Sequence, residues 1–446
     1  MKQIEQKNNK MVDVDIDDSK EGNIVEVDES LACANIVFIG HVDAGKSTIA
    51  GNILYKTGMV DERTIEKFQK EAKDNNRESW FMAYIMDINE EERQKGKTSE
   101  VGKAFFKSKT KRFTILDAPG HLGYIADMLK GASQADYAGM VISAKMGEFE
   151  AGFDRDGRTR EHAILAKSLG VSKFVVIINK MDEESVKWDE ERYNFIKAQL
   201  GDYFKKVGFK NEDIYWIPVS GLTGDNLLEN LSKYKCPWYN GPNLMDLLDS
   251  LPLPPRDDTL PLRIPILDRY KDAGLYVLGK IESGIVRYGQ TYTLMPNKVN
   301  IEVSWIFNSE ENGVKYARTG ESVRLKIRGL ENESDIQTGS VICSVDSLCP
   351  MFNVFEAEVM FLELVEHKPI ISNGYACILH IHTLEEECII DQILAQIDKK
   401  EEKKVKFIPG YSRAKVLISV TNKAICADKF ENFKSLGRFT LRDEGK

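Results

Sequence analysis

Short apolar runs alternate with longer amphipathic stretches from residue 31 to about residue 250. The apolar runs have the length of buried strands, and residues 159–170 place apolar positions at helical spacing and end at Gly170. This alternation is typical of a parallel sheet with helices on both faces. The candidate strands are residues 35–40, 113–118, 138–144, 174–180 and 214–220.

The pattern changes after three prolines, Pro252, Pro254 and Pro255. Beyond them, short strands of alternating polarity are separated by glycine turns, as in β-barrels. A weaker break lies at Cys349 and Pro350. We therefore expect an α/β domain at residues 31–255, followed by two all-β barrel domains at residues 256–348 and 349–446.

Acidic residues are concentrated near the N-terminus. Between Met11 and Leu31 there are eight acidic residues against one lysine, with little apolar surface to offset the entropy of ordering. We expect residues 1–30 to form a disordered acidic tail. Two interpretations stay open, a solubilising leader and a docking segment for a basic partner.

The composition excludes several classes of protein. The net charge of −9 argues against stand-alone binding of DNA or RNA. No run of roughly 18 apolar residues and no basic-then-apolar leader is present, so we expect neither a membrane span nor a secretory signal, and a cytoplasmic location. The seven cysteines contain no CxxC pair, which favours reduced core thiols. His380 and His382 near Cys377 and Cys388 lack a recognised metal-ligand spacing.

Residues 40–47 match the phosphate-binding motif GxxxxGK[ST]. The motif follows a candidate strand and precedes a candidate helix, which is the context that it requires. Its glycines allow backbone N–H groups to surround phosphates, Lys46 can reach the β- and γ-phosphates, and the Ser47 hydroxyl can ligate Mg²⁺. The expected fold is therefore an α/β P-loop domain followed by two all-β barrel domains.

Four further segments lie at the ends of candidate strands or in polar connections. Asp117 can hold a Mg²⁺-bound water, and Gly120 can sense the γ-phosphate. Asp182, in the segment Asn179, Lys180, Met181 and Asp182, can accept from the two donors that guanine offers and adenine lacks. Ser220, Gly221 and Leu222 can support the base, and Thr98 can close over Mg²⁺. Ligands bind at these strand ends in open α/β sheets, so we expect GTP or GDP with Mg²⁺. The expected fold class is an α/β P-loop GTPase domain followed by two all-β barrel domains.

The segments GHVDAGKST, DAPGH, GEFEAGF, TREHA and NKMD resemble the translational GTPases of the elongation-factor one-alpha family. The resemblance covers about residues 33–446 and implies a GTPase domain with two β-barrels. It also implies that His121 orients the attacking water for GTP hydrolysis. The residues that it assigns to the phosphates are Asp43, Ala44, Gly45, Lys46, Ser47 and Thr48.

Within this family, four stretches are similar to the eukaryotic class-II polypeptide release factors: residues 92–101, 366–371, 379–383 and 437–446. The resemblance implies a monomer that binds a class-I release factor and acts with it at a stop codon on the ribosome. A ribosome-rescue GTPase is the alternative, and aminoacyl-tRNA delivery is disfavoured by Lys97 and the last barrel. A GTPase subunit of sulfate activation would require an adenylyltransferase partner.

The chain departs from its family at two places. Ala126 and Asp127 stand where relatives commonly carry proline and asparagine, so this segment is expected to contact its partner differently. The chain ends at Lys446, whereas the family continues into a final strand. Two explanations stay open, a last barrel that lacks one strand and a truncated chain.

Overall fold

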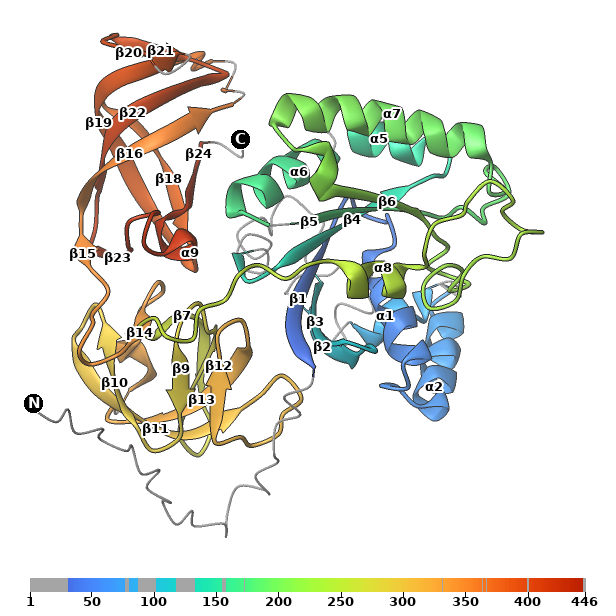
Figure 1. Cartoon of the computed structure of the whole chain (residues 1–446), viewed down its shortest axis with the longest axis horizontal. Helices are drawn as coiled ribbons and strands as arrows, with labels where there is room; N and C mark the ends of the chain where they lie inside the picture. The colour runs from blue at the N-terminus through green and yellow to red at the C-terminus, as the bar shows by residue number, and fades with distance from the viewer. Residues whose placement is uncertain are drawn as a thin grey trace, which may run out of the picture.

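The computed structural model describes residues 31–76, 80–86, 102–117, 133–154, 158–171, 173–330, 332–362, 364–365, 367–398 and 401–443. The expected fold class is confirmed, because an α/β domain precedes two all-β domains (Figure 1). The predicted acidic tail at residues 1–30 lies outside the described residues.

The α/β domain is built on a six-stranded sheet in the order β2-β3-β1-β4-β5-β6. All neighbouring strands are parallel except β2 and β3, which are antiparallel. The five predicted strands are present, and β2 is an additional edge strand. The strands are β1 (Ala32–Ile39), β2 (Gly102–Lys107), β3 (Lys111–Asp117), β4 (Tyr137–Ser143), β5 (Lys173–Asn179) and β6 (Ile214–Pro218).

Helices cover both faces of this sheet. Successive apolar side chains of β1 point to opposite faces, so both faces must be covered. Ile36 and Phe38 belong to the core under α1 and α8, whereas Val37 and Ile39 belong to the core under α6 and α7 (Figure 1). The helical segments are α1 (Lys46–Lys56), α2 (Glu62–Asp74), η2 (Ala83–Ile85), α5 (Glu148–Phe153), α6 (Arg158–Leu169), α7 (Glu190–Val207), η4 (Asn211–Asp213) and α8 (Leu244–Ser250).

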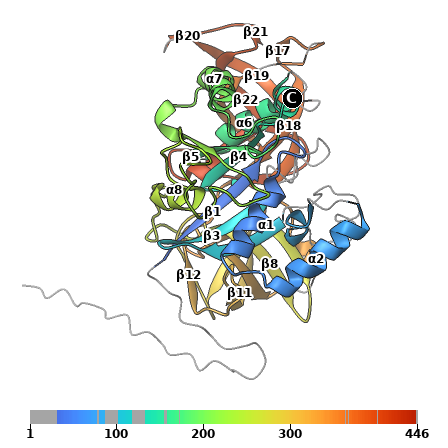
Figure 2. The same ribbon diagram turned by 90° about the vertical axis from the view of Figure 1, so that its right-hand side faces the viewer.

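The helix α2 lies at the periphery of the α/β domain. Figure 2 shows it in front of the strands and away from the sheet. Among its residues only Ile65 and Ala72 are buried, and its N-cap Asp61 accepts a hydrogen bond from the Thr64 N–H. The polar remainder of α2 therefore faces solvent.

The first β domain closes into a six-stranded barrel, in the order β10-β11-β13-β8-β7-β14. Inward-pointing side chains such as Val277, Ile301 and Leu325 fill its interior. The elements of this domain are β7 (Arg263–Lys271), β8 (Leu275–Lys280), β9 (Ile285–Arg287), β10 (Thr291–Met295), β11 (Val299–Phe307), β12 (Tyr316–Arg318), β13 (Ser322–Arg328), η5 (Glu333–Asp335) and β14 (Val341–Cys343).

The second β domain has a main sheet that runs from β16 through β22, β19 and β18 to β24, with β20 paired to β19. Its terminal strands, β16 and β24, both line a cavity of ≈ 1930 Å³ that extends to α6 and α7. The elements are β15 (Met351–Phe352), β16 (Val354–Phe361), β17 (Ile370–Ser372), β18 (Tyr375–Ile381), β19 (Leu384–Asp398), β20 (Glu401–Lys403), β21 (Phe407–Pro409), β22 (Ser412–Val420), β23 (Ile425–Cys426), α9 (Lys434–Gly437) and β24 (Phe439–Arg442).

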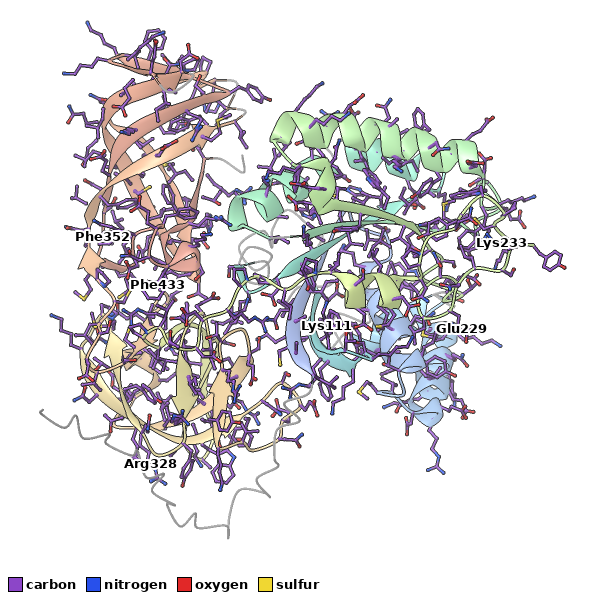
Figure 3. The ribbon with its side chains drawn as sticks, viewed as in Figure 1. Lys111, Glu229, Lys233, Arg328, Phe352 and Phe433 are labelled. Atoms are coloured by element: carbon purple, nitrogen blue, oxygen red, sulfur yellow. The ribbon has the colours of Figure 1, made fainter. Side chains whose placement is uncertain are left out.

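An apolar cluster joins the two β domains. Met295, Val341 and Cys343 of the first domain pack with residues of the second, namely Cys349, Cys426 and Leu436. Phe433 borders this cluster, and the Arg263 guanidinium lies 5.1 Å from its ring centroid. Figure 3 shows Phe433 at the junction of the two domains.

Candidate functional site

The loop between β1 and α1 carries the phosphate-binding motif, and two of its glycines are required by close approaches. A Cβ on Gly40, where φ is +144°, would lie 2.3 Å from the Val141 carbonyl oxygen. A Cβ on Gly45, where φ is +94°, would lie 2.3 Å from the Asn179 Nδ2 atom. Both positions combine a backbone conformation that favours glycine with no room for a side chain. The motif therefore forms a tight cradle at the N-terminus of α1.

The Lys46 side chain is buried inside this cradle. Its ammonium donates to the carbonyl oxygens of Gly40, at 3.2 Å, and His41, at 3.1 Å. Burial lowers the pKa of Lys46, while the charges of Asp117 and Asp43 act in the opposite direction. An anion bound in the cradle would add the negative charge that this buried ammonium favours.

Asn179, at the end of β5, connects the cradle to the loop after β6. Its Nδ2 donates to the Ala44 carbonyl oxygen at 2.8 Å, and its Oδ1 accepts from the Gly221 N–H at 2.7 Å. Asn52 of α1 donates to the Gly221 carbonyl oxygen at 3.0 Å. These bonds join the cradle and α1 to two segments that lie more than a hundred residues further along the chain.

The other predicted base-binding residues lie around this connection. Lys180, with a φ of 61°, donates to Glu148 Oε2 at 2.7 Å. Burial pushes the pKa of Glu148 upward, but hydrogen bonds from Lys180 and Ser143 hold it below its ordinary value. Asp182 is half-buried. Ser220 is buried, and Leu222 is exposed at the rim.

The predicted magnesium ligands are only partly within the described residues. Asp117 is the last residue of β3 and is fully buried, and its charge acts on Lys46. Ser47 is half-buried in the first turn of α1, beside Thr48. A serine hydroxyl and a carboxylate are hard oxygen donors of the kind Mg²⁺ prefers, so these two residues fit that ion. Thr98, Gly120 and His121 lie outside the described residues.

The sequence reasoning assigned no role to His162, which contacts the cradle directly. Its Nδ1 atom accepts from the Gly40 N–H at 3.0 Å, and the side chain is 1% exposed. Burial lowers the pKa of His162 to about 3, so the ring stays neutral and able to accept. The feature that could have indicated this role is the position of a polar residue on α6 next to the buried Ala163 and about one turn from the buried Ala166.

Other kinds of site find no support in the residues that the structure describes. They contain no group of three or more His, Cys, Asp or Glu side chains that could hold a metal ion. Across the same residues, no helix is both long enough and apolar enough to span a membrane.

Comparison with protein families gives two matches. Residues 32–253 match the elongation factor Tu GTP binding domain, so this part of the chain carries a GTP binding domain. Residues 354–446 match the GTP-eEF1A C-terminal domain-like family. The two matches cover the α/β domain and the second β domain.

Curated relatives are similar to this chain over most of its length. The eukaryotic peptide chain release factor GTP-binding subunit of Ogataea pini is 47% identical over 415 residues, which are 92% of this chain and 56% of the relative. The protein of the same name from Candida albicans is 46% identical over 414 residues, 92% of this chain and 57% of the relative. The chain thus spans somewhat more than half the length of these relatives.

A solved structure has the same fold. It is the S. cerevisiae Ski7 GTPase-like domain, bound to GDP and inorganic phosphate, with a TM-score of 0.73 and 19% identity. The comparison covers 93% of each chain. At this identity the likeness concerns the fold alone.

Proposed function

The chain belongs to the eukaryotic peptide chain release factor GTP-binding subunits, which are translational GTPases, and we propose that it binds GTP and GDP and hydrolyses GTP to GDP and phosphate during translation termination. The proposed partners are a class-I release factor and the ribosome, which the protein meets as a monomer in the cytoplasm. The curated relatives favour this role over ribosome rescue and aminoacyl-tRNA delivery.

The observation that carries the proposal is the pair of hydrogen bonds made by Asn179. They tie the phosphate cradle, at Ala44, to the loop that would support a base, at Gly221. A nucleotide fits such an arrangement because its phosphates and its base must be held at once by different loops. Asn179 therefore acts by positioning both loops, and its second amide hydrogen stays available to the base.

We assign the remaining residues to parts of the nucleotide. The phosphates lie against the backbone of residues 43–48 and the Lys46 ammonium, which is already buried in the cradle. Ser47, Asp117 and Thr98 hold Mg²⁺, which supplies positive charge to the phosphate oxygens. Gly120 senses the γ-phosphate, and His121 orients the attacking water. Lys180 and Asp182 contact guanine, with support from Ser220, Gly221 and Leu222.

The proposed domain boundaries follow the changes in sequence pattern. They separate an acidic tail at residues 1–30, a GTP-binding domain at 31–255, and β domains at 256–348 and 349–446. The long stretch without a strand or helix between α8 and β7 supports the second of these boundaries.

The guanine assignment is tested by Asp182→Asn. Xanthine carries a carbonyl where guanine carries its amine, so an amide at position 182 is expected to favour XTP. We expect the XTP-to-GTP affinity ratio to rise by about 100-fold or more, because unpaired polar groups in such a site strongly reject the wrong ligand. Fluorescence titration with labelled nucleotides measures the ratio.

Glu184→Gln, which removes an exposed carboxylate two residues away, is the matched control and should leave the preference unchanged. An unaltered preference in Asp182→Asn would remove Asp182 from the base site. The cellular role is tested separately by GTP hydrolysis with ribosomes halted at a stop codon. We expect turnover only when the class-I release factor is present, and stimulation by aminoacyl-tRNA in its place would contradict the termination role.

A further inference from the structure

Two of the seven cysteines lie side by side in the second β domain. Cys377 on β18 and Cys388 on β19 are direct partners in the antiparallel register, and their Sγ atoms are 3.5 Å apart. All seven cysteines are free thiols in this structure. The pair is therefore a dithiol held between two neighbouring strands.

The strand geometry permits a bond between the two sulfurs. Directly opposed residues of antiparallel strands have Cα atoms about 4.5 to 5.5 Å apart, which lies within the range found for disulfides. The sulfurs must approach by about 1.5 Å in total to reach a bonding distance of about 2 Å. Rotation of the two side chains supplies much of this movement, so the strands need not separate.

One of the two thiols borders an open space. Cys377, which is 9% exposed, lines the cavity of ≈ 1930 Å³ between α6, α7 and the second β domain, whereas Cys388 is 1% exposed, and both side chains belong to one apolar core cluster. A small polar reagent therefore reaches the pair from the side of Cys377. Cys33, which is half-buried, provides a comparison elsewhere in the chain.

We propose that Cys377 and Cys388 form an oxidation site at which hydrogen peroxide converts the two thiols into an intramolecular disulfide. In the first step, the thiolate of one cysteine attacks a peroxide oxygen, the O–O bond breaks, and a sulfenic acid forms. The hydroxide that leaves takes up a thiol proton and becomes water. In the second step, the other sulfur attacks the sulfenic sulfur and releases a second water.

Hydrogen peroxide is the only co-reactant that these two steps require. Two cysteine sulfurs are oxidised, the O–O bond of one peroxide is reduced, and the two thiol hydrogens leave in two water molecules. The contact between the sulfurs also assists the first step. The hydrogen bond from Cys377 lowers the pKa of Cys388, and the same bond, together with burial, raises the pKa of Cys377.

The test is peptide mapping of the full chain after exposure to about one equivalent of hydrogen peroxide. No Lys or Arg lies between Cys377 and Cys388, so trypsin leaves both in one peptide, while cleavage at Glu385, Glu386 or Glu387 separates them. We expect the two halves to stay linked after the second cleavage and to separate on addition of dithiothreitol. The count of free thiols in denaturant should fall from seven to five.

Two variants sharpen the experiment. Cys377→Ser should abolish the link and leave a sulfenic acid on Cys388, the cysteine whose pKa the contact lowers, and dimedone should trap it. Cys236→Ser, which removes a buried cysteine of the α/β domain, should retain the link. Because the unmodified chain alone decides the question, poor folding of a variant does not affect the test. The proposal is wrong if the halves separate without reductant, or if Cys33 is oxidised while Cys377 and Cys388 stay reduced.

Discussion

The buried Lys46 ammonium donates to two carbonyl oxygens of its own loop, and burial disfavours its charged form by lowering its pKa. The two carbonyl dipoles compensate the Lys46 charge only in part. A phosphate group bound at the cradle would supply a full negative charge. Nucleotide binding and the stability of the loop are therefore coupled, because the ligand stabilises only the folded cradle.

Substitution of His121 separates binding from hydrolysis. We expect His121→Ala to retain GTP affinity within about twofold, since the proposed contact is to water, and to lower ribosome-stimulated turnover by about 100-fold or more. Single-turnover hydrolysis with ribosomes and the class-I release factor measures the effect. Equal stimulated turnover in the variant and the parent protein would exclude this role.

The half-buried imidazole of His382 gives a pH dependence. Its Nε2 donates to the Cys426 carbonyl oxygen at 2.8 Å, and its Nδ1 accepts from the Thr383 N–H at 2.8 Å, so protonation at Nδ1 breaks a bond. Burial lowers the pKa of His382 from 6.5 to about 4. The unfolded chain then binds more protons as the pH falls below 6.5, and the folded state loses up to about 3 kcal/mol by pH 4.

We test this dependence with His382→Asn, which tolerates the φ of 42° at this turn and does not titrate. Urea unfolding between pH 7 and pH 5 should show a steeper loss of stability in the parent protein than in the variant. Burial raises the pKa of the neighbouring Glu282, whose titration acts in the opposite direction and is common to both proteins. Parallel pH profiles would contradict the assignment.

The motif spacing was sufficient to predict the positions of Gly45, Lys46 and Ser47, because these residues act on a ligand through one short loop. It could not predict the two bonds of Asn179 or the bond to His162. Those bonds depend on which strands are neighbours in the sheet and on how α6 crosses it. No local pattern encodes such partners.

The helix α6 contacts both the phosphate cradle and the second β domain. At one end of this connection, the His162 Nδ1 atom accepts a hydrogen bond from the Gly40 N–H. At the other, Glu161 accepts from Arg442 of β24 at 2.6 Å, and Thr440 donates to Ser168 at 3.1 Å. One helix thus contacts both the cradle and β24, with no loop between the two contacts.

A double-mutant cycle on Glu161 and Arg442 measures the strength of this contact. Their side chains are only 18% and 10% exposed, so we expect a coupling energy of about 1 to 3 kcal/mol in thermal unfolding. The matched control is the pair Glu358 and Arg413 in the same β domain, whose side chains are 45% and 59% exposed. That pair should contribute less than about 1 kcal/mol. Equal coupling in the two pairs would contradict a special role for the α6 contact.

Five of the six strands of the α/β domain were predicted because each is a continuous apolar run buried on both faces. The edge strand β2 was missed because its sequence mixes lysines with aromatic residues. It is held by pairing with β3, where the rings of Phe106 and Phe113 stack with centroids 4.9 Å apart. This contact is visible only once the two strands are placed together.

One buried carboxylate makes several of the contacts that join the α/β domain and the first β domain. Asp136 accepts from Arg256 at 2.9 Å and from Lys280 at 3.0 Å, and also from the Asn35 backbone N–H at 2.9 Å. The Asn35 side chain in turn donates to the Gly320 carbonyl oxygen. The joint therefore consists of charges and hydrogen bonds that satisfy one another.

Asp136→Ala should loosen this joint. The substitution leaves two cationic groups without their counter-charge, at an expected cost of about 3 to 5 kcal/mol. Because Arg256 is then released, we expect trypsin to cleave after it about tenfold faster. Limited proteolysis followed by mass spectrometry gives the rate.

Asp202→Ala, which removes an exposed carboxylate from α7, is the control and should cleave like the parent protein. If Asp136→Ala is cleaved after Arg256 no faster than this control, Asp136 does not hold the two domains together.

The apolar cluster that contains Met295, Cys349 and Leu436 gives the two β domains a different kind of joint. The ionic contacts of Asp136, Glu161 and Arg442 are largely buried, which limits their screening by salt, whereas salt leaves an apolar cluster intact or strengthens it. Cooling weakens the apolar cluster, because hydrophobic contacts lose strength as the temperature falls. The two β domains are therefore joined to each other by contacts that weaken on cooling, and to the α/β domain by buried charges that salt screens little.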